Sequence, residues 1–208
     1  GLIAFVGANV FSQDEKKPEG GGMPGMTPEM MQGIKDYMKN MKPGSHHEFL
    51  ENFVGTWKTT TRMWMMGEGS GPPMTTAGKS DVKWVLGKRY VMEEHRGKMM
   101  MPDENMQMKE VDFEGIGMTG YDNDRNLYCG SWASNLNTTM LNFKGSVSQD
   151  KKTITFYGEM DEPMMKVYGR IVKYQVKLDS KDKHTFAVYD LMAGDNYKVF
   201  DITYERAE

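Results

Sequence analysis

The sequence predicts an all-β protein, a closed up-and-down antiparallel barrel of about ten strands preceded by one or two short helices. From residue 56 onward, apolar and polar residues alternate in short runs that turn-forming residues separate. No helix-length apolar pattern interrupts this series, which excludes the crossover helices of a parallel sheet. So many antiparallel strands would leave two exposed edges in an open sheet, and closing the sheet into a barrel removes both edges.

Composition limits the class of protein. A chain of 208 residues with 38% hydrophobic and 26% charged residues is typical of one soluble domain with one core. The formal net charge is -3, and the basic residues are scattered among acids, which excludes a nucleic-acid-binding surface. Cys129 is the single cysteine, so no intramolecular disulfide stabilises the fold.

Residues 1–12 are predicted to be the remnant of a secretory signal peptide. An apolar run begins at Leu2, and the small residues Val10 and Ser12 stand where a cleavage site would need them. We therefore expect a periplasmic or secreted protein whose mature chain begins at Gln13. The apolar run is shorter than the about 20 residues that span a bilayer, so an integral membrane protein is not expected.

Residues 13–44 are predicted to be a flexible segment, rich in Met, Gly and Pro, that contains one short helix. Thr27 is a favourable N-cap and Pro28 a favourable first helical residue. Apolar residues then recur at helical spacing, and Pro43 ends the pattern. A protein partner that receives the apolar side of this helix, residues 27–41, is one functional hypothesis.

Residues 45–208 are predicted to form the barrel domain. Ser45 and Glu48 fit a capping box that starts a second short helix, and Gly55 ends this helix. The expected strands lie near residues 56–66, 79–86, 88–98, 112–121, 126–134, 138–146, 152–160, 166–177, 183–192 and 196–206.

One pair of motifs resembles the closure of lipocalin (calycin) barrels. Gly55-Thr56-Trp57 opens the first strand, and Arg206 lies at the end of the last strand. The resemblance implies that the arginine stacks across the tryptophan and closes the barrel floor, which is a cation–π contact supplemented by hydrogen bonds.

Five successive segments extend the resemblance to a bacterial family called domain of unknown function 1579. They are HHEFLENFVGTWKTTTRMWM, VKWVLGKRYVMEEHRGKMM, FEGIGMTGYDNDRNLYCGSW, ITFYGEMDEP and ITYER, in order over roughly residues 46–206. The resemblance implies a calycin-like barrel that is often exported and has no established activity. The related nitrobindins bind haem through a histidine, but no motif around His95 or His184 matches theirs, so the sequence names no cofactor.

The leading hypothesis for function is a non-enzymatic barrel that binds a small apolar or amphipathic molecule. A ten-stranded barrel has room for such a ligand in its lumen. Catalysis is the less favoured hypothesis, because no Ser-His-Asp order is recognisable. One carboxylate of Glu93 or Glu94 is expected to face the lumen, although solvation at the surface is the commoner interpretation of such residues. The residues proposed to line the ligand site are Trp64, Met92, Tyr128, Trp132 and Phe143.

Methionine is the most unusual feature of the composition, with 22 residues. Thioethers bind Cu(I) and Ag(I) in preference to hard cations, so soft-metal sequestration is the alternative hypothesis. The favoured interpretation is adaptable apolar contact at the barrel mouth, because most clusters have no histidine or cysteine nearby. The candidate metal ligands under the alternative are Met99, Met100, Met101, Met106 and Met108.

Three motifs imitate ligand sites without the context that those sites need. Residues 115–120 have the Gly-x-Gly-x-x-Gly spacing of dinucleotide sites, but a turn and another strand follow instead of a helix. Asp122 and Asp124 imitate a calcium loop that lacks its glycine and distal glutamate. His46 and His47 are adjacent and point in different directions on a helix, so they are predicted to serve the helix start.

Overall fold

A computed structural model describes residues 25–162 and 166–207 of the chain. It divides the chain into two compact units, residues 1–39 and residues 40–208. The predicted signal peptide and its cleavage before Gln13 lie outside the described residues. The boundary near residue 40 is close to the predicted start of the barrel domain at residue 45.

The described part of the first unit consists mainly of the helix α1 (Pro28–Asn40), where the sequence predicts a helix over residues 27–41. Thr27 acts as the predicted N-cap, because its Oγ1 accepts a hydrogen bond from the backbone N–H of Met30 at 3.2 Å. Glu29 lies in the first turn and Lys39 in the last, the arrangement that the helix dipole favours. Binding of a partner by this helix remains a prediction.

The second unit begins with a short helix, α2 (Ser45–Phe49), which continues as the 3₁₀ turn η1 (Leu50–Phe53). The predicted capping box is wrong in its residues. Gly44 is the N-cap, and its backbone N–H donates to Nδ1 of His47 at 3.2 Å. An imidazole nitrogen takes the accepting role predicted for Glu48, so one of the two histidines does serve the helix start.

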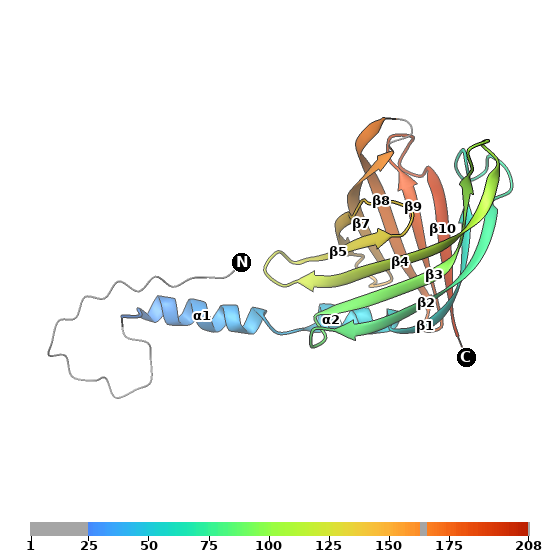
Figure 1. Ribbon diagram of the computed structural model, residues 1–208. Coiled ribbons are helices and arrows are strands. Elements are labelled where there is room, and N and C mark those ends of the chain that lie inside the picture. The colour runs from blue at the N-terminus through green and yellow to red at the C-terminus, as the bar shows by residue number, and fades with distance from the viewer. Residues whose placement is uncertain (1–24, 163–165, 208) are drawn as a thin grey trace. The chain divides into compact units, whose positions relative to one another are not determined.

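Ten strands follow and form one closed antiparallel barrel in which sequence neighbours are also sheet neighbours and β1 pairs with β10 (Figure 1). This confirms the predicted up-and-down barrel. The strands are β1 (Gly55–Met63), β2 (Met74–Val85), β3 (Tyr90–Pro102), β4 (Met108–Asp122), β5 (Leu127–Ser134), β6 (Leu141–Val147), β7 (Thr153–Glu162), β8 (Val167–Ser180), β9 (Lys183–Asp190) and β10 (Lys198–Arg206).

The hairpin of β3 and β4 is longer than the sequence suggests. The sequence predicts that β3 ends near residue 98, but Met99, Met100 and Met101 pair with residues 109–111 of β4. Alternation of apolar and polar residues stops at this methionine run, which is why the pattern missed the extension. The paired backbone satisfies its hydrogen bonds within the sheet regardless of the side chains.

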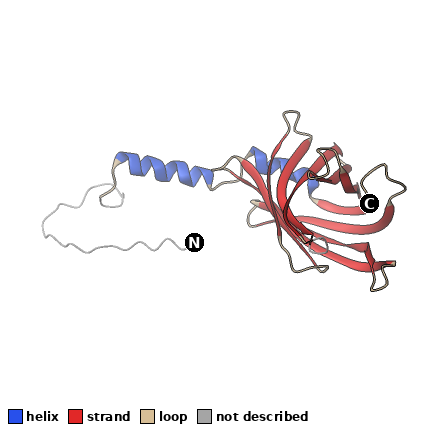
Figure 2. Ribbon diagram, turned by 90° about the horizontal axis from the view of Figure 1, so that it is seen from above, coloured by secondary structure: helices blue, strands red, loops and turns tan. Residues whose placement is uncertain are grey.

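Because neighbouring strands run in opposite directions, successive connections lie at alternate ends of the barrel. We call the end that carries α2 and η1 the floor, and the end with the connections around residues 64–73, 103–107, 135–140 and 191–197 the mouth. Figure 2 shows the helical turns beside the strands that form the barrel wall. The core lies inside the barrel and is deepest near the floor, where Leu50, Trp57 and Tyr128 are almost completely buried.

Candidate functional site: the barrel lumen

The floor is closed by the pair that the calycin resemblance implies. Trp57 and Arg206 are register partners on β1 and β10, and the guanidinium carbon lies 4.2 Å from the centre of the indole. The Arg206 guanidinium also donates to the carbonyls of Val54 at 3.1 Å and Lys181 at 2.9 Å. The contact combines cation–π attraction with charge-assisted hydrogen bonds.

Steric constraints explain why the first residue of the Gly-x-Trp motif is glycine. Gly55 has a φ of +135°, which L side chains rarely adopt. A β-carbon at this position would lie 2.5 Å from the Nη1 atom of Arg206. Only glycine therefore lets the arginine cover the floor at the start of the first strand.

Helical residues complete the floor from the chain segment before β1. Leu50 and Phe53 point into the barrel and are 1% and 8% exposed, and the carbonyl of Phe53 accepts a hydrogen bond from the Trp57 indole at 2.9 Å. Tyr128 packs edge-on against Phe49, and its hydroxyl donates to the carbonyl of His46 at 3.1 Å. The floor is thus a packed layer of rings beneath the lumen.

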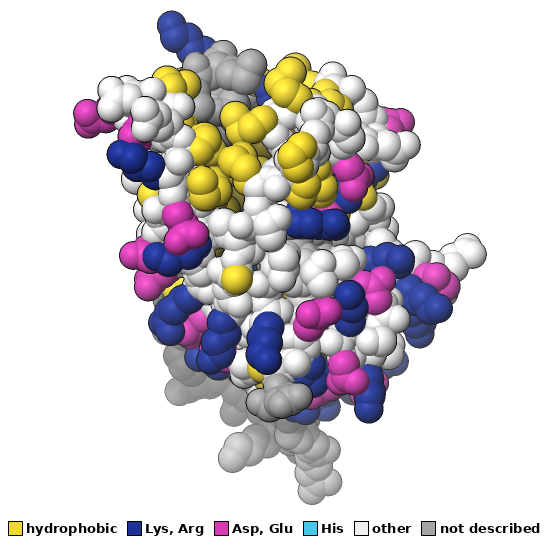
Figure 3. All heavy atoms as spheres, turned by 90° about the vertical axis from the view of Figure 1, so that its right-hand side faces the viewer, with side chains coloured by type: hydrophobic (Ala, Val, Ile, Leu, Met, Phe, Trp, Pro, Cys, Tyr) yellow, Lys and Arg dark blue, Asp and Glu magenta, His cyan; other side chains and the backbone are white. Residues whose placement is uncertain are grey.

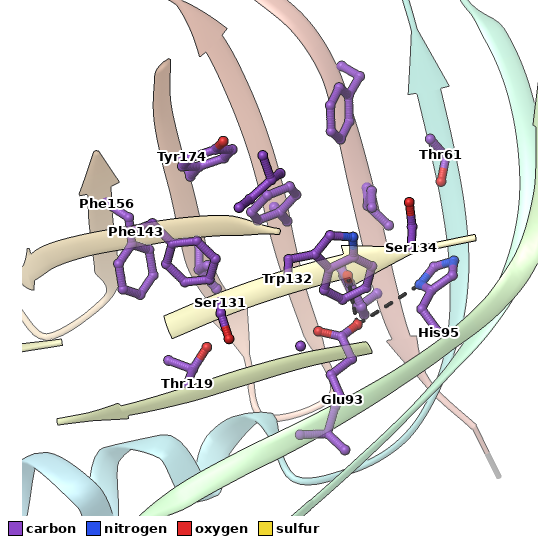
Figure 4. A pocket seen from close by; sticks show the side chains of 18 of the residues that line it. Thr61, Glu93, His95, Thr119, Ser131, Trp132, Ser134, Phe143, Phe156 and Tyr174 are labelled. Atoms are coloured by element: carbon purple, nitrogen blue, oxygen red, sulfur yellow. Dashed lines mark hydrogen bonds and ion pairs between the residues drawn. The ribbon is translucent and has the colours of Figure 1, made fainter. Parts of the chain in front are cut away.

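Above this layer lies a cavity of about 360 Å³. Its walls are mainly apolar and aromatic, which is typical of a site for a small organic molecule. Figure 4 shows Trp132, Phe143, Phe156 and Tyr174 around it. The aromatic side chains that line the cavity are Phe53, Phe113, Trp132, Phe143, Phe156, Tyr174, Phe186, Phe200 and Tyr204.

The glycines of residues 115–120 provide the seat for one of these rings. A β-carbon at Gly115 would overlap the Trp132 ring, and one at Gly117 would lie 2.7 Å from its Cε3 atom. The third glycine, Gly120, lies on the opposite face of β4, where a β-carbon would meet Tyr90. The glycines therefore permit close approach of rings on both faces of the strand, and the element that follows them is the strand β5, where a dinucleotide site needs a helix.

The most polar part of the cavity is centred on Glu93. Its Oε1 accepts a hydrogen bond from Ser80 Oγ at 2.7 Å and from the Tyr204 hydroxyl at 3.1 Å. Burial raises the pKa of this carboxyl, and the two hydroxyl donors act in the opposite direction because they favour the charged form. The carboxyl thus comes from β3 and is held by residues of β2 and β10, the strands that adjoin β1.

Two buried histidines flank this group. His95 Nδ1 lies 3.9 Å from Glu93 Oε1 (Figure 4), and His184 stacks on the Tyr204 ring with the two centres 4.3 Å apart. Burial lowers the pKa of His95 to about 4 and that of His184 to about 3, where the Arg206 charge adds to the effect. Both imidazoles are therefore neutral near pH 7. Among the described residues, neither Nδ1 atom has a hydrogen-bond partner, and the Tyr174 hydroxyl in the cavity wall has none either.

The mouth is surrounded by methionines. Met65, Met66, Met106, Met140 and Met192 lie on four of its connections, and each is more than 60% exposed. Figure 3 shows hydrophobic side chains gathered toward one end of the molecule, whereas Lys, Arg, Asp and Glu cover much of the rest of that face. A second, smaller cavity of about 90 Å³ near this end is lined by Thr61, Met63, Met74, Thr76, Met99, Met100 and Phe200.

The structure brings two of the five proposed ligand-site residues to the cavity, Trp132 and Phe143. Tyr128 belongs to the floor and does not line the cavity. Trp64 follows the end of β1 and packs outside the lumen between the cations of Arg62 and Lys198, 5.4 and 5.1 Å from the indole centre.

The prediction that Met92 lines the ligand site is wrong. Val91 and Glu93 line the cavity, and neighbouring residues of a strand point to opposite faces, so Met92 points outward. The candidate metal ligands are also dispersed. Met99 and Met100 line the small cavity, but Met106 is 77% exposed on the turn between β3 and β4.

Sequence reasoning placed a carboxylate of Glu93 or Glu94 in the lumen, and Glu93 is the one that lines it. It did not find that Tyr204 of β10 donates to this carboxyl, or that His184 of β9 stacks on the Tyr204 ring, because β9 and β10 are distant from β3 in sequence. The available signal was the equal spacing of Phe200, Ile202 and Tyr204, which places the hydroxyl on the inner face.

In the described part of the chain, no group of three or more His, Cys, Asp or Glu side chains is arranged to hold a metal ion. No helix within those residues is both long and apolar enough to cross a bilayer.

No curated protein matches the chain. A redesigned β-barrel matches at a TM-score of 0.37 and 14% identity, covering 78% of this chain and 96% of its own. The S-type phycobiliprotein lyase CPES from Guillardia theta matches at a TM-score of 0.46 and 11% identity, covering 80% of this chain and 99% of its own. The family model described as protein of unknown function, DUF1579, matches residues 42–206, nearly the whole barrel unit, and the chain belongs to that family.

Proposed function

We propose that this protein is an exported, non-enzymatic barrel that binds a small amphipathic molecule in its lumen. The observation that carries the proposal is the cavity of about 360 Å³, which has mainly aromatic and aliphatic walls and a carboxyl, that of Glu93, among its polar groups. The apolar walls gain free energy by burying a ligand's apolar surface, and the patch around Glu93 fixes its orientation. Export rests on the N-terminal apolar run alone.

The barrel architecture supports binding over catalysis. The floor is sealed by Trp57 and Arg206, so a ligand enters from the mouth. In the described residues, the polar groups that line the lumen include no hydroxyl paired with a histidine base, the arrangement that activates a nucleophile. The nearest approach between a histidine and a carboxyl in the lumen is the 3.9 Å separation of His95 and Glu93.

Two adjacent threonines of β1 provide a matched test of lumen binding. Thr61 lines the cavity, whereas Thr60 is exposed on the outer face. Thr61→Phe would place a ring inside the cavity, and Thr60→Phe would place the same ring in solvent. Binding is measured from the fluorescence of the neutral apolar probe N-phenyl-1-naphthylamine.

We expect the unaltered protein and Thr60→Phe to bind the probe with equal affinity, and Thr61→Phe to lose at least about tenfold in affinity. Thermal unfolding of both variants checks that the barrel remains folded. Equal affinity of the two folded variants, or no binding by the unaltered protein, would contradict the proposal. If the variants differ as expected, native mass spectrometry of protein purified from its own host identifies the retained molecule by its mass.

A further inference from the structure

The carboxyl of Glu93 has one oxygen occupied and an open side toward the cavity. Both hydroxyl donors, Ser80 Oγ and the Tyr204 hydroxyl, bind the same atom, Oε1. The side chain is 26% accessible although it comes from a strand in the barrel wall, and it lines the cavity. Figure 4 shows the carboxyl directed into the space between Trp132 and His95. The second oxygen is therefore available to a molecule in the lumen.

This carboxyl has no cationic partner among the described residues. The only basic group within 4.0 Å of it is His95, and burial of that imidazole keeps its pKa at about 4. Lys98 also lines the cavity, but its Nζ lies 2.7 Å from Asp112 and its side chain is 46% exposed. An acid in an enclosed site without a counter-charge is costly, so a bound cation would be favourable there.

The remaining walls suit the rest of such a ligand. Phe113 and Trp132 are stacked with their centres 6.4 Å apart, and Phe143 and Phe156 meet edge to face at 5.0 Å. Aromatic faces attract an ammonium group through their electron density and also pack against hydrocarbon. The cavity thus offers one anion and several rings to the same molecule.

We infer that the lumen binds an amphipathic amine, with its protonated nitrogen against the free oxygen of Glu93 and its apolar body along the aromatic wall. This inference rests on the proposed function and names the chemical class of its ligand. A carboxylate with the same hydrocarbon chain as the amine is disfavoured, because its negative charge would repel Glu93. A neutral alcohol would gain the apolar contacts without the ion pair.

The groups that face Glu93 set the pH dependence of this binding. They are Ser80 from β2, His95 from β3 and Tyr204 from β10, with His184 of β9 behind the Tyr204 ring. Burial raises the pKa of Glu93, so acidification neutralises it before an ordinary carboxyl. Amine affinity is therefore expected to fall on acidification, whereas alcohol affinity stays constant.

The test compares three ligands with one chain length: octylamine, octanol and octanoate. Each displaces N-phenyl-1-naphthylamine from the full chain at pH 7.5. We expect octylamine to bind about tenfold tighter than octanol, and octanoate to bind weakest. Glu93→Gln should bring the ratio of amine to alcohol affinity to about one. Glu94→Gln is the matched control, since Glu94 points outward and pairs with Lys83 at 2.9 Å, and it should leave the ratio unchanged.

The outcomes separate the two proposals. A lumen that binds no probe overturns both the proposed function and this inference. A lumen that binds the probe, and takes octanol or octanoate as well as or better than octylamine, overturns this inference and leaves the proposed function standing. An amine preference that persists in Glu93→Gln also overturns it, because the ion pair would not be its source.

Discussion

The floor and the mouth of the barrel are built from different side chains. At the floor, Trp57 is fully buried, and it is held by the Arg206 guanidinium and the carbonyl of Phe53. At the mouth, methionines such as Met65 and Met106 are more than 70% exposed. Rigid rings with defined hydrogen bonds fix one geometry, whereas unbranched thioethers adapt to many. The difference indicates a sealed structural end and an adaptable entrance.

The largest expected effect is at the floor. Arg206→Ala removes the cover of Trp57 and three hydrogen bonds to the carbonyls of Val54 and Lys181, and should lower the free energy of unfolding by about 3 kcal/mol. Met106→Ala at the mouth should change it by less than about 0.5 kcal/mol, because the side chain is 77% exposed. Urea denaturation measures both variants, and comparable losses would contradict the contrast between the two ends.

Acidification should lower the free energy of unfolding through two buried histidines, His95 and His184. The unfolded chain protonates His95 and His184 near pH 6.5, whereas the folded chain keeps both neutral to about pH 4 and pH 3. The stability is therefore complete above pH 6.5 and is lost as the pH falls toward these values, at about 1.4 kcal/mol per pH unit for each histidine.

Glu93 acts in the opposite direction above pH 4.5, because its raised pKa lets the folded state hold a proton that the unfolded state has released. Glu93→Gln removes this offset and should steepen the loss of stability on acidification. Urea midpoints across pH 4 to 7 measure the slope, and ¹⁵N NMR of the imidazoles measures each histidine. A His184 ring that titrates near pH 6.5 in the folded protein would refute the explanation.

A smaller effect is expected in the wall between the two ends. Gly117→Ala places a β-carbon 2.7 Å from the Trp132 ring, so the ring must shift toward the lumen. We expect a loss of about 1 kcal/mol in stability and weaker binding of N-phenyl-1-naphthylamine. Gly33→Ala is the control, because a β-carbon there meets nothing within 4 Å. Unchanged probe binding by Gly117→Ala would show that the indole does not border the ligand.

The smallest effect concerns metal binding at the mouth. If the methionines provide apolar contact, the protein should bind Cu(I) no tighter than about micromolar. A competition titration with a Cu(I) chelator at pH 7 and pH 5 measures this affinity. Tight binding that persists at pH 5, and is lost when Met99, Met100 and Met101 are replaced by Leu, would favour soft-metal sequestration, since thioethers have no proton to displace.

The fold was predictable because its signals are local. Alternation and turn residues mark the ten strands, and Gly55 with Trp57 marks the start of the barrel. The strand bounds are predicted wrongly where residues pair in the sheet without alternating between apolar and polar. The methionine run that begins at Met99 does not alternate, yet it pairs with β4.

The site was less predictable because strand β3 departs from the usual rule that apolar residues face inward. Glu93 and His95 face the lumen, so reading the apolar Met92 as a lining residue gives the wrong face. Trp64 lies beyond the end of β1 and an odd number of residues from the inward-facing Trp57, so strand alternation does not place it in the lumen. A sequence gives the period of a strand readily, and its phase only when the inner face is uniformly apolar.

The glycine seat under Trp132 has a consequence for how this barrel changes in evolution. Every glycine codon becomes an alanine codon by a single base substitution. At Gly115 and Gly117 that substitution adds a methyl group beneath the indole and displaces it toward the cavity. The size of the lumen is therefore adjustable in single mutational steps at two glycines beneath one ring, which gives a lineage a direct route to new cavity shapes without replacing any aromatic side chain of the wall.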